Sequence, residues 1–116
     1  MPDYTIYHNP RCSKSRQTLA LLEENGIEAS IILYLEDNPS ASDIKQLLTK
    51  LGISARELLR KGEEAYKTFN LADTSLSEET LINAMVEAPK LIERPIVVRG
   101  SKAVLGRPPE NVLKII

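Results

Sequence analysis

The chain has 116 residues, of which 42% are hydrophobic and 27% charged, a composition that suits one folded domain and excludes a disordered chain. No apolar run approaches the roughly 20 residues that a membrane-spanning helix needs, and no basic-then-apolar leader opens the sequence, so we expect a cytoplasmic protein. One Phe, no Trp and no basic run make nucleic acid a weak candidate partner.

Charge is unevenly distributed along the chain, although the net charge is only −1. Residues 1–22 contain three basic residues and one acidic residue, and residues 94–116 contain five and one. The stretch between them has seven basic and fourteen acidic residues. If the two ends meet in the fold, they form a positive region suited to a small anion.

The first third of the chain predicts a strand, a helix and a second strand. Residues 5–8 (TIYH) are β-prone and end at Asn9-Pro10, and residues 13–25 predict a helix that stops at Asn25-Gly26. Residues 29–35 (ASIILYL) predict a strand that is buried on both faces. Such a unit normally has parallel strands with a right-handed crossover.

The middle of the chain predicts helices. Apolar residues recur at i, i+3, i+4 and i+7 from Ile44 to Leu51, just before a glycine, and mark one face of a helix. The capping-box pattern from Ser54 to Glu57 predicts a new helix that begins at Ser54. A second such pattern at residues 75–78 predicts a helix through about Glu87.

The last quarter predicts a hairpin and a final helix. Residues 95–99 and 102–105 are β-prone and separated by Gly100-Ser101, which indicates a hairpin. Two prolines then precede a helix expected over residues 110–116. The order is strand–helix–strand, a helical insertion, then strand–strand–helix. It predicts an α/β protein with a thioredoxin-like fold and a four-stranded mixed sheet, in a single domain over 1–116.

Cys12 is the only cysteine, so an internal disulfide and a cysteine-based zinc site are excluded. It immediately precedes a predicted helix, where unsatisfied N–H groups and the helix dipole favour a negative charge. Arg11, Lys14 and Arg16 act in the same direction. Because nucleophilic attack requires the thiolate, we expect a reactive cysteine rather than the alternative, a buried structural one. Its redox chemistry would need a thiol from another molecule.

The turn around Cys12 also predicts an anion site. Its backbone N–H groups and the hydroxyls of Ser13 and Ser15 suit a tetrahedral oxyanion, although either serine can equally be a helix cap. Ser15 makes the motif Cys-x-x-Ser, which excludes dithiol chemistry. His8, the only histidine, either supports the thiolate or is an ordinary core or surface residue. With one His and one Cys we expect no metal site.

Three arginines are candidates for holding an oxyanion. Arg60 closes the capped helix, Arg94 precedes the third predicted strand, and Arg107 follows the fourth. A guanidinium is well shaped for forked binding of such a group, whereas solvated surface charge is the simpler interpretation of any single arginine. We expect three other arginines to lie on ordinary exposed faces, namely Arg16, Arg56 and Arg99.

These residues together resemble a known family over essentially the whole chain. Tyr7-His8-Asn9-Pro10 with Cys12, Ser15 and Arg16 is similar to the catalytic loop of the glutaredoxin-coupled arsenate reductases, in the ArsC/Spx superfamily. Residues 32–36 (ILYLE) resemble their second strand. The surroundings of their three oxyanion-binding arginines resemble, in order, residues 57–61 (ELLRK), 94–98 (RPIVV) and 106–108 (GRP), and the second of these also contains the position of their cis-proline.

The resemblance implies a role for each candidate residue. Cys12 would attack arsenate and form a covalent thiol–arsenic adduct, and the arginines would hold the oxyanion and its developing charge; they are Arg60, Arg94 and Arg107. His8 and Ser15 would favour the thiolate. Glutathione as co-substrate and glutaredoxin would then reduce the adduct and release arsenite, with no bound cofactor and no membrane partner. The Arg94–Pro95 bond is expected to be cis.

Within the superfamily, two features are closer to the chromosomal YfgD-like branch. Ser13-Lys14 stands where the dedicated resistance enzymes usually carry a glycine and a neutral residue, and the sequence ends directly after its last predicted helix. The alternative function is a non-catalytic, Spx-like regulatory or interaction module, whose relatives typically carry Cys-x-x-Cys. Ser15 and the set of three arginines favour the enzyme.

Overall fold

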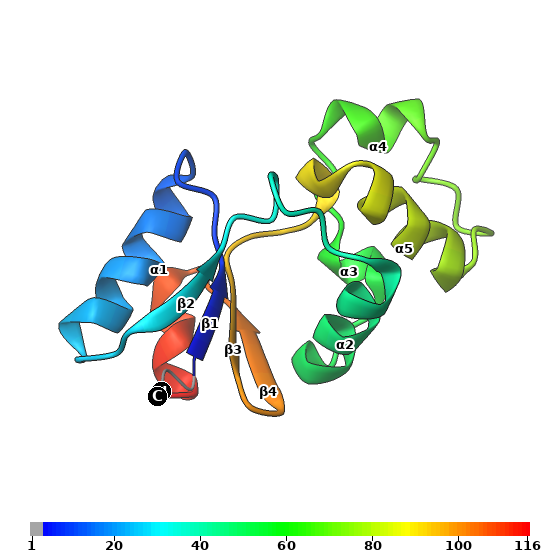
Figure 1. Ribbon diagram of the computed structural model, residues 1–116. Helices are drawn as coiled ribbons and strands as arrows, with labels where there is room; N and C mark the ends of the chain where they lie inside the picture. Colours follow the sequence, from blue (N-terminus) through cyan, green and yellow to red (C-terminus); the bar gives the residue numbers. More distant parts are fainter. Residues whose placement is uncertain (1–3) are drawn as a thin grey trace. The chain divides into compact units, whose positions relative to one another are not determined.

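The computed structural model describes residues 4–116, which form two compact units (Figure 1). The sheet unit combines the chain up to Asp37 with Arg94–Ile116, and the helical unit is Asn38–Glu93. The assignment of one domain to residues 1–116 stays a prediction. Among the described residues, none of the helices has both the length and the apolar character needed to cross a membrane.

The sheet unit contains a four-stranded mixed sheet in the order β2-β1-β3-β4. Strand β1 pairs in parallel with β2 and antiparallel with β3, which pairs antiparallel with β4. The predicted mixed sheet and hairpin are therefore confirmed, and the two basic ends of the chain meet. The strands are β1 (Tyr4–Tyr7), β2 (Ala29–Ile32), β3 (Ile96–Arg99) and β4 (Lys102–Leu105).

At one end of the strands, four segments that are far apart in the sequence come together. Tyr7 pairs with both Ile32 and Ile96, and Ile96 pairs with Leu105. The chain therefore leaves β1, β2 and β4, and enters β3, at this same end of the sheet. The loop from β1 to Cys12 lies here between the turn after β2 on one side and the segments around Arg94 and Arg107 on the other.

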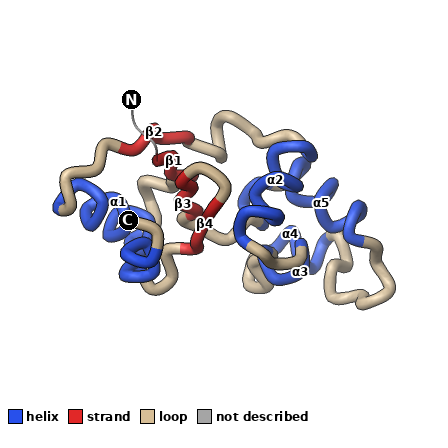
Figure 2. The backbone as a smooth tube through the Cα atoms, turned by 90° about the horizontal axis from the view of Figure 1, so that it is seen from below, coloured by secondary structure: helices blue, strands red, loops and turns tan. Residues whose placement is uncertain are grey.

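Helix α1 (Ser13–Glu24) and the 3-10 helix η2 (Pro109–Lys114) pack on one face of this sheet (Figure 2). Between them and the strands lies a core in which Ile6, Leu22 and Val112 are completely buried. An ordinary helix was expected over residues 110–116. The segment is instead a 3-10 helix of six residues, with i→i+3 bonds such as the one from the Asn111 N–H to the Pro108 carbonyl at 3.0 Å. The Asn111 side-chain amide also donates to the carbonyls of Leu105 and Arg107, both at 3.1 Å, and so ties the start of this segment to the end of β4.

The prediction for residues 29–35 is wrong in two respects. Strand β2 ends at Ile32 and is an edge strand, so that Ile31 is 51% exposed rather than buried. Residues 33–37 form a turn closed by the N–H groups of Glu36 and Asp37, which donate to the Leu33 carbonyl at 2.9 and 2.8 Å. An apolar run does not distinguish a central strand from an edge strand, because the order of strands is a tertiary property.

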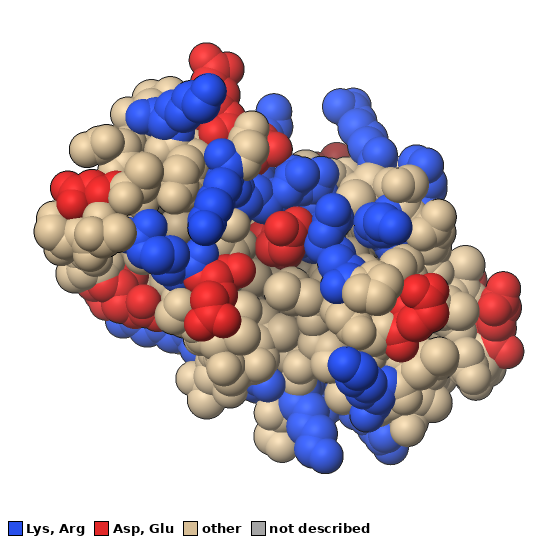
Figure 3. Space-filling model, turned by 180° about the vertical axis from the view of Figure 1, so that it is seen from behind, with Lys and Arg blue, Asp and Glu red and all other residues tan. Residues whose placement is uncertain are grey.

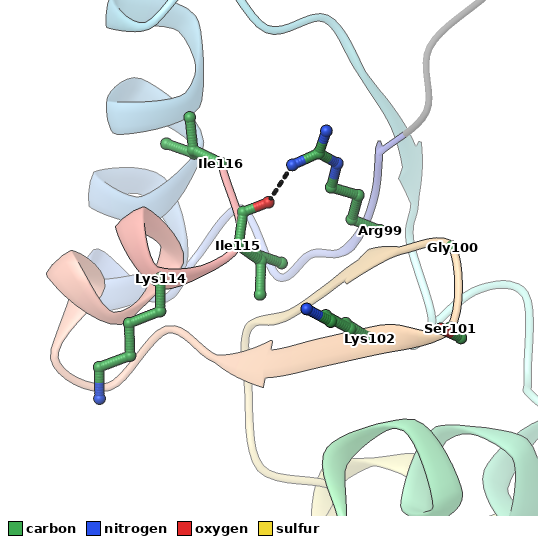
Figure 4. Close-up of a pocket in the computed structure, with 7 residues that line it drawn as sticks. All are labelled: Arg99, Gly100, Ser101, Lys102, Lys114, Ile115 and Ile116. Carbon is green, nitrogen blue, oxygen red and sulfur yellow. Dashed lines mark hydrogen bonds between the residues drawn. The ribbon is translucent and has the colours of Figure 1, made fainter.

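The β3–β4 hairpin is tied to the end of η2 by Arg99. Its Nη1 donates to the Ile115 carbonyl at 2.9 Å, and its guanidinium lies 5.3 Å from the centre of the Tyr4 ring. Figure 4 shows Arg99 reaching toward Ile115 at a pocket that Lys102 and Lys114 also line. Arg99 is exposed, as expected, but it holds three segments together.

The helical unit confirms most of the predicted capping. Ile44, Leu47 and Leu48 are buried, and α2 ends at Gly52 in a left-handed conformation. The Ser54–Glu57 capping box is formed at the predicted place, although the helix it starts has only four residues. The elements are α2 (Ala41–Leu51), α3 (Ala55–Leu58), α4 (Glu64–Thr68), α5 (Glu78–Glu87) and the 3-10 helix η1 (Pro89–Leu91).

The second predicted capping box is wrong. Helix α5 is capped by Ser77, whose Oγ accepts from the Thr80 N–H at 3.1 Å, while Ser75 bonds to Asp73. The Glu78 carboxylate accepts instead from the N–H of Ala55, at 2.7 Å, in the first turn of α3. The Glu78 side chain, which the local pattern assigned to the cap of α5, therefore forms a contact between α5 and α3 instead.

Candidate active site

The loop between β1 and α1 is shaped by Asn9. Its carbonyl accepts from the Cys12 N–H at 3.0 Å, and its Oδ1 accepts from the Arg11 N–H at 3.0 Å, as in an Asx turn. Arg16 is exposed, as expected, and its Nη1 donates to the Pro10 carbonyl at 2.9 Å. The sequence analysis missed this use of Asn9, although Asn-Pro is itself a turn signal.

Cys12 is the N-cap residue of α1 and is half-buried. The N–H groups of the first helical turn have no carbonyl one turn earlier to bond, so together with the helix dipole they favour an anion next to this residue. Nη1 of Arg107 lies 3.9 Å from Cys12 Sγ. A guanidinium at this distance stabilises a thiolate and equally an oxyanion attached to the sulfur.

Arg107 is oriented by the backbone at the start of β3. The same Nη1 donates to the Arg94 carbonyl at 3.2 Å. The Arg94–Pro95 bond is cis, as the resemblance implied, and the Arg107–Pro108 bond is also cis. The structure thus brings Cys12, Arg107 and the Arg94 backbone together across 95 positions of sequence.

Arg60 belongs to the helical unit, where acidic side chains surround it. Its Nη1 is 2.8 Å from Glu63 Oε2, and its Nε is 3.4 Å from Glu93 Oε1. The backbone N–H of Arg60 donates to the Leu91 carbonyl at 2.8 Å, and this bond fixes the segment that follows α3. The two carboxylates offset part of its charge, so an oxyanion bound there would compete with them. Its role as an oxyanion ligand stays a prediction.

Basic side chains outside the site have structural partners as well. Lys and Arg side chains lie among Asp and Glu on the molecular face drawn in Figure 3. Arg56 was expected on an exposed face, but it is half-buried and donates to the carbonyls of Leu71 and Asp73 at 2.8 and 2.9 Å. The expectation was wrong because a helical residue's exposure depends on which segment the tertiary fold places over it.

His8 and Ser15, the two predicted supporting residues, are bonded to each other. His8 Nδ1 is 2.6 Å from Ser15 Oγ, and both residues are buried. The Asn9 N–H donates to the same Oγ at 3.0 Å, and the hydroxyl can donate its own proton to Nδ1 when His8 is neutral. Burial, together with the charge of Arg16, lowers the pKa of His8 below 6.5, which favours this neutral form. Support for the thiolate by an imidazolium charge is therefore disfavoured, and support through Ser15 and the loop stays a prediction.

Thr18 and Gly106 also position the site, and the sequence analysis missed both. Thr18 is completely buried, and its Oγ1 donates to the Lys14 carbonyl at 2.8 Å and lies 3.4 Å from the Gly106 carbonyl. A Cβ on Gly106 would lie 2.8 Å from Pro95 Cγ and closer still to Thr18 Oγ1. Glycine thus permits the close approach of α1, Pro95 and the residue before Arg107. A lone glycine after a strand is the signal that pointed to such an approach.

The described residues contain no group of three or more His, Cys, Asp or Glu side chains that is placed to hold a metal ion. What the site does contain is one thiol at a helix N-terminus and a guanidinium next to it. This pairing suits nucleophilic attack by sulfur on a tetrahedral oxyanion.

Comparison with known proteins agrees with this arrangement. The chain is 62% identical to the uncharacterized protein YfgD of Escherichia coli K12, over 96% of the chain and 94% of that protein. It is 51% identical to an arsenate reductase of Haemophilus influenzae, over 96% and 97%. The solved structure of an arsenate reductase from Vibrio cholerae is 54% identical and superposes with a TM-score of 0.95 over 97% of each chain. The ArsC family model matches residues 7–115. The chain therefore belongs to the ArsC family and has its thioredoxin-like fold.

Proposed function

We propose that the protein is an arsenate reductase that works through a Cys12 adduct, with glutathione and glutaredoxin as reductants. The observation that carries this proposal is the Arg107 guanidinium 3.9 Å from Cys12 Sγ, which pairs a nucleophile with a binding group for a tetrahedral oxyanion. The name of the Haemophilus influenzae relative, an arsenate reductase, supports the same substrate.

In the first step the Cys12 thiolate attacks arsenic(V). A sulfur–arsenic bond forms, and one arsenate oxygen takes up protons and leaves as water, so that arsenic is not yet reduced. The remaining oxygens carry negative charge, which Arg107 and the first-turn N–H groups of α1 are placed to stabilise. Arg94 and Arg60 complete the proposed oxyanion-binding set.

In the second step a glutathione thiolate attacks Sγ of the adduct. A disulfide bond forms while the sulfur–arsenic bond breaks and its electron pair stays on arsenic. Arsenic(V) becomes arsenic(III), arsenite leaves, and the two sulfur atoms are oxidised. Because Cys12 is the only cysteine, this thiol has to come from another molecule. Glutaredoxin then reduces the mixed disulfide and restores the Cys12 thiol.

The site favours this enzyme over an Spx-like interaction module. A module that only binds another protein has no need of a guanidinium beside its single thiol, nor of two further arginines of the same set. The contact between Arg107 and Cys12 is therefore the feature on which the two functions differ.

A coupled assay with arsenate, glutathione, glutaredoxin, glutathione reductase and NADPH tests the proposal. We expect NADPH oxidation to depend strictly on glutathione, to be accelerated by glutaredoxin, and to be poorly supported by thioredoxin alone. Cys12→Ser should be inert because a serine hydroxyl is not ionised at neutral pH, while Gln17→Ala on the exposed face of α1 should be active. Mass spectrometry should find glutathione on Cys12. Sustained arsenite production without any added thiol would contradict the mechanism, and a complete lack of turnover would favour the interaction module.

The arginine set is tested in the same assay. Loss of a charge-assisted hydrogen bond to the oxyanion should lower kcat/KM for arsenate roughly ten- to a hundredfold in each of three variants, Arg60→Ala, Arg94→Ala and Arg107→Ala. Lys90→Ala, which removes an exposed charge, is the control and should stay close to wild type. Equally mild effects in all four variants would mean that these arginines are ordinary surface charges.

A further inference from the structure

A pocket of about 290 Å³ borders the loop that carries Cys12, close to the roughly 300 Å³ at which small-molecule sites begin. One of its walls is the loop itself, with Pro10 and Arg11, and the buried His8 also lines it. The opposite wall is the turn that follows β2, with Leu33, Leu35 and Glu36. The mechanism described above does not use this pocket.

The order of the strands places the pocket and the segments with Arg94 and Arg107 on different flanks of the loop. Strand β1 lies between β2 and β3, and the same end of all three strands faces the Cys12 loop. The turn after β2 forms one flank, and the segments with Arg94 and Arg107 form the other. Because Arg107 approaches Cys12 Sγ, the oxyanion belongs to the β3–β4 flank, and the β2 flank is left for another ligand.

The chemistry of the second step requires such a second approach. When a thiolate displaces arsenic from Sγ, the forming and breaking bonds are in line, so the incoming sulfur comes from the side opposite to the arsenic. If the arsenic lies toward Arg107, the incoming thiol arrives from the side of Sγ away from Arg107, and in the strand order this is the side of the loop on which β2 lies. The pocket borders Arg11, the residue directly before Cys12.

The lining of the pocket matches a small peptide thiol. Leu33, Leu35 and Pro10 provide apolar walls, and Arg11 and Glu36 place opposite charges on the two sides. Glutathione carries an ammonium group, two carboxylates and a thiol on a three-residue scaffold that spans about 10 Å when extended. An anionic side chain for the ammonium and a guanidinium for a carboxylate are the complementary groups.

We propose that this pocket binds the glutathione co-substrate and that Glu36 and Arg11 orient it for attack on the Cys12 adduct. The inference rests on the proposed function, and it adds the residues that recognise the thiol. Glu36 accepts the ammonium group, Arg11 binds a carboxylate, and the two leucines exclude water from the apolar part of the peptide.

Binding is measured without turnover, in the Cys12→Ser variant titrated with S-methylglutathione and followed by amide NMR. We expect saturable shifts at Leu33, Leu35 and Glu36. Glu36→Lys in the same background should weaken binding about fivefold or more, since it replaces an attraction by a repulsion at an exposed site. Glu28→Lys makes the same charge change just before β2, at the opposite end of that strand, and should have no effect. Shifts confined to β3 and β4, or shifts that do not saturate, would overturn the proposal.

Kinetics then separate this proposal from the proposed function. Glu36→Lys should raise KM for glutathione about fivefold and leave KM for arsenate unchanged. If wild type lacks arsenate turnover but S-methylglutathione still saturates the β2 flank, the proposed function fails and the pocket remains a thiol-peptide site. If turnover is normal and Glu36→Lys leaves KM for glutathione unchanged, the pocket assignment fails. It also fails if Glu36→Lys alters only the response to glutaredoxin, because the pocket would then serve a protein.

Discussion

The helix caps of the helical unit and the candidate site of the sheet unit depend on polar contacts of very different range. In the helical unit, Ser40, Ser54 and Ser77 each cap a helix by bonding a residue three positions later. In the sheet unit, contacts join residues 88 to 111 positions apart; the pairs are Thr18–Gly106, Cys12–Arg107 and Tyr4–Ile115. Helix ends in one unit therefore form from neighbouring residues, whereas the candidate site exists only when the whole sheet unit is assembled.

This difference predicts how each unit responds to substitution. A change in a long-range contact of the sheet unit should reduce both stability and the chemistry at Cys12, since the same contacts position the site. A change in a helix cap should reduce stability locally and leave the geometry around Cys12 unaffected.

The largest effect on stability is expected for Gly106→Ala. The new Cβ would meet Thr18 Oγ1 and Pro95 Cγ, and overpacking of this kind costs about 1–3 kcal/mol of unfolding free energy. Urea denaturation should show the loss, and kcat/KM for arsenate should fall with it because Arg107 moves. Adding Thr18→Ala removes the closest contact and should restore part of both.

Gly62→Ala is the matched control for this change, since no atom lies within 4 Å of the Cβ it would add. We expect it to alter the unfolding free energy by at most about 1 kcal/mol, in the stabilising direction. If Gly106→Ala and Gly62→Ala behave alike, the close approach at Gly106 does not hold the site.

A smaller effect, confined to the helical unit, is expected for Ser54→Ala. Loss of the cap removes the bond that Ser54 Oγ accepts from the Glu57 N–H and should cost about 1 kcal/mol. Amide exchange should accelerate in α3, while β1 and the alkylation of Cys12 by iodoacetamide should be unaffected. Ser101→Ala, an exposed hairpin residue, is the control. Equal loss of protection in α3 and β1 would contradict the separation of the two units.

The smallest effect concerns pH and arises in the sheet unit alone, since His8 is the only histidine. Burial lowers the pKa of His8 below the unfolded value of 6.5, so the unfolded state binds a proton that the folded state resists. Its contribution to stability is fully present above pH 6.5 and is lost as pH falls through this value toward the folded pKa. Denaturation at several pH values should show this slope in wild type and a weaker slope in His8→Gln. An unchanged slope would mean that other groups cause it.

Local patterns made several predictions that the structure confirms. The caps at Ser54 and Gly52, the apolar face of α2 and the hairpin around Gly100-Ser101 all depend on residues within a few positions of one another. The exclusion of an internal disulfide likewise follows from counting one cysteine. Such features can be predicted because the groups that interact are already close in the unfolded chain.

The sequence by itself therefore determined the order of elements, most helix ends and the position of the single cysteine directly before a helix. Only the tertiary structure decided that β2 is an exposed edge, that Glu78 serves α3 rather than its own helix cap, and that Thr18 meets Gly106. It also decided that Arg107 approaches Cys12 Sγ. Each of these depends on strand order and on the packing of distant segments, and neither leaves a periodic or spacing pattern in the chain.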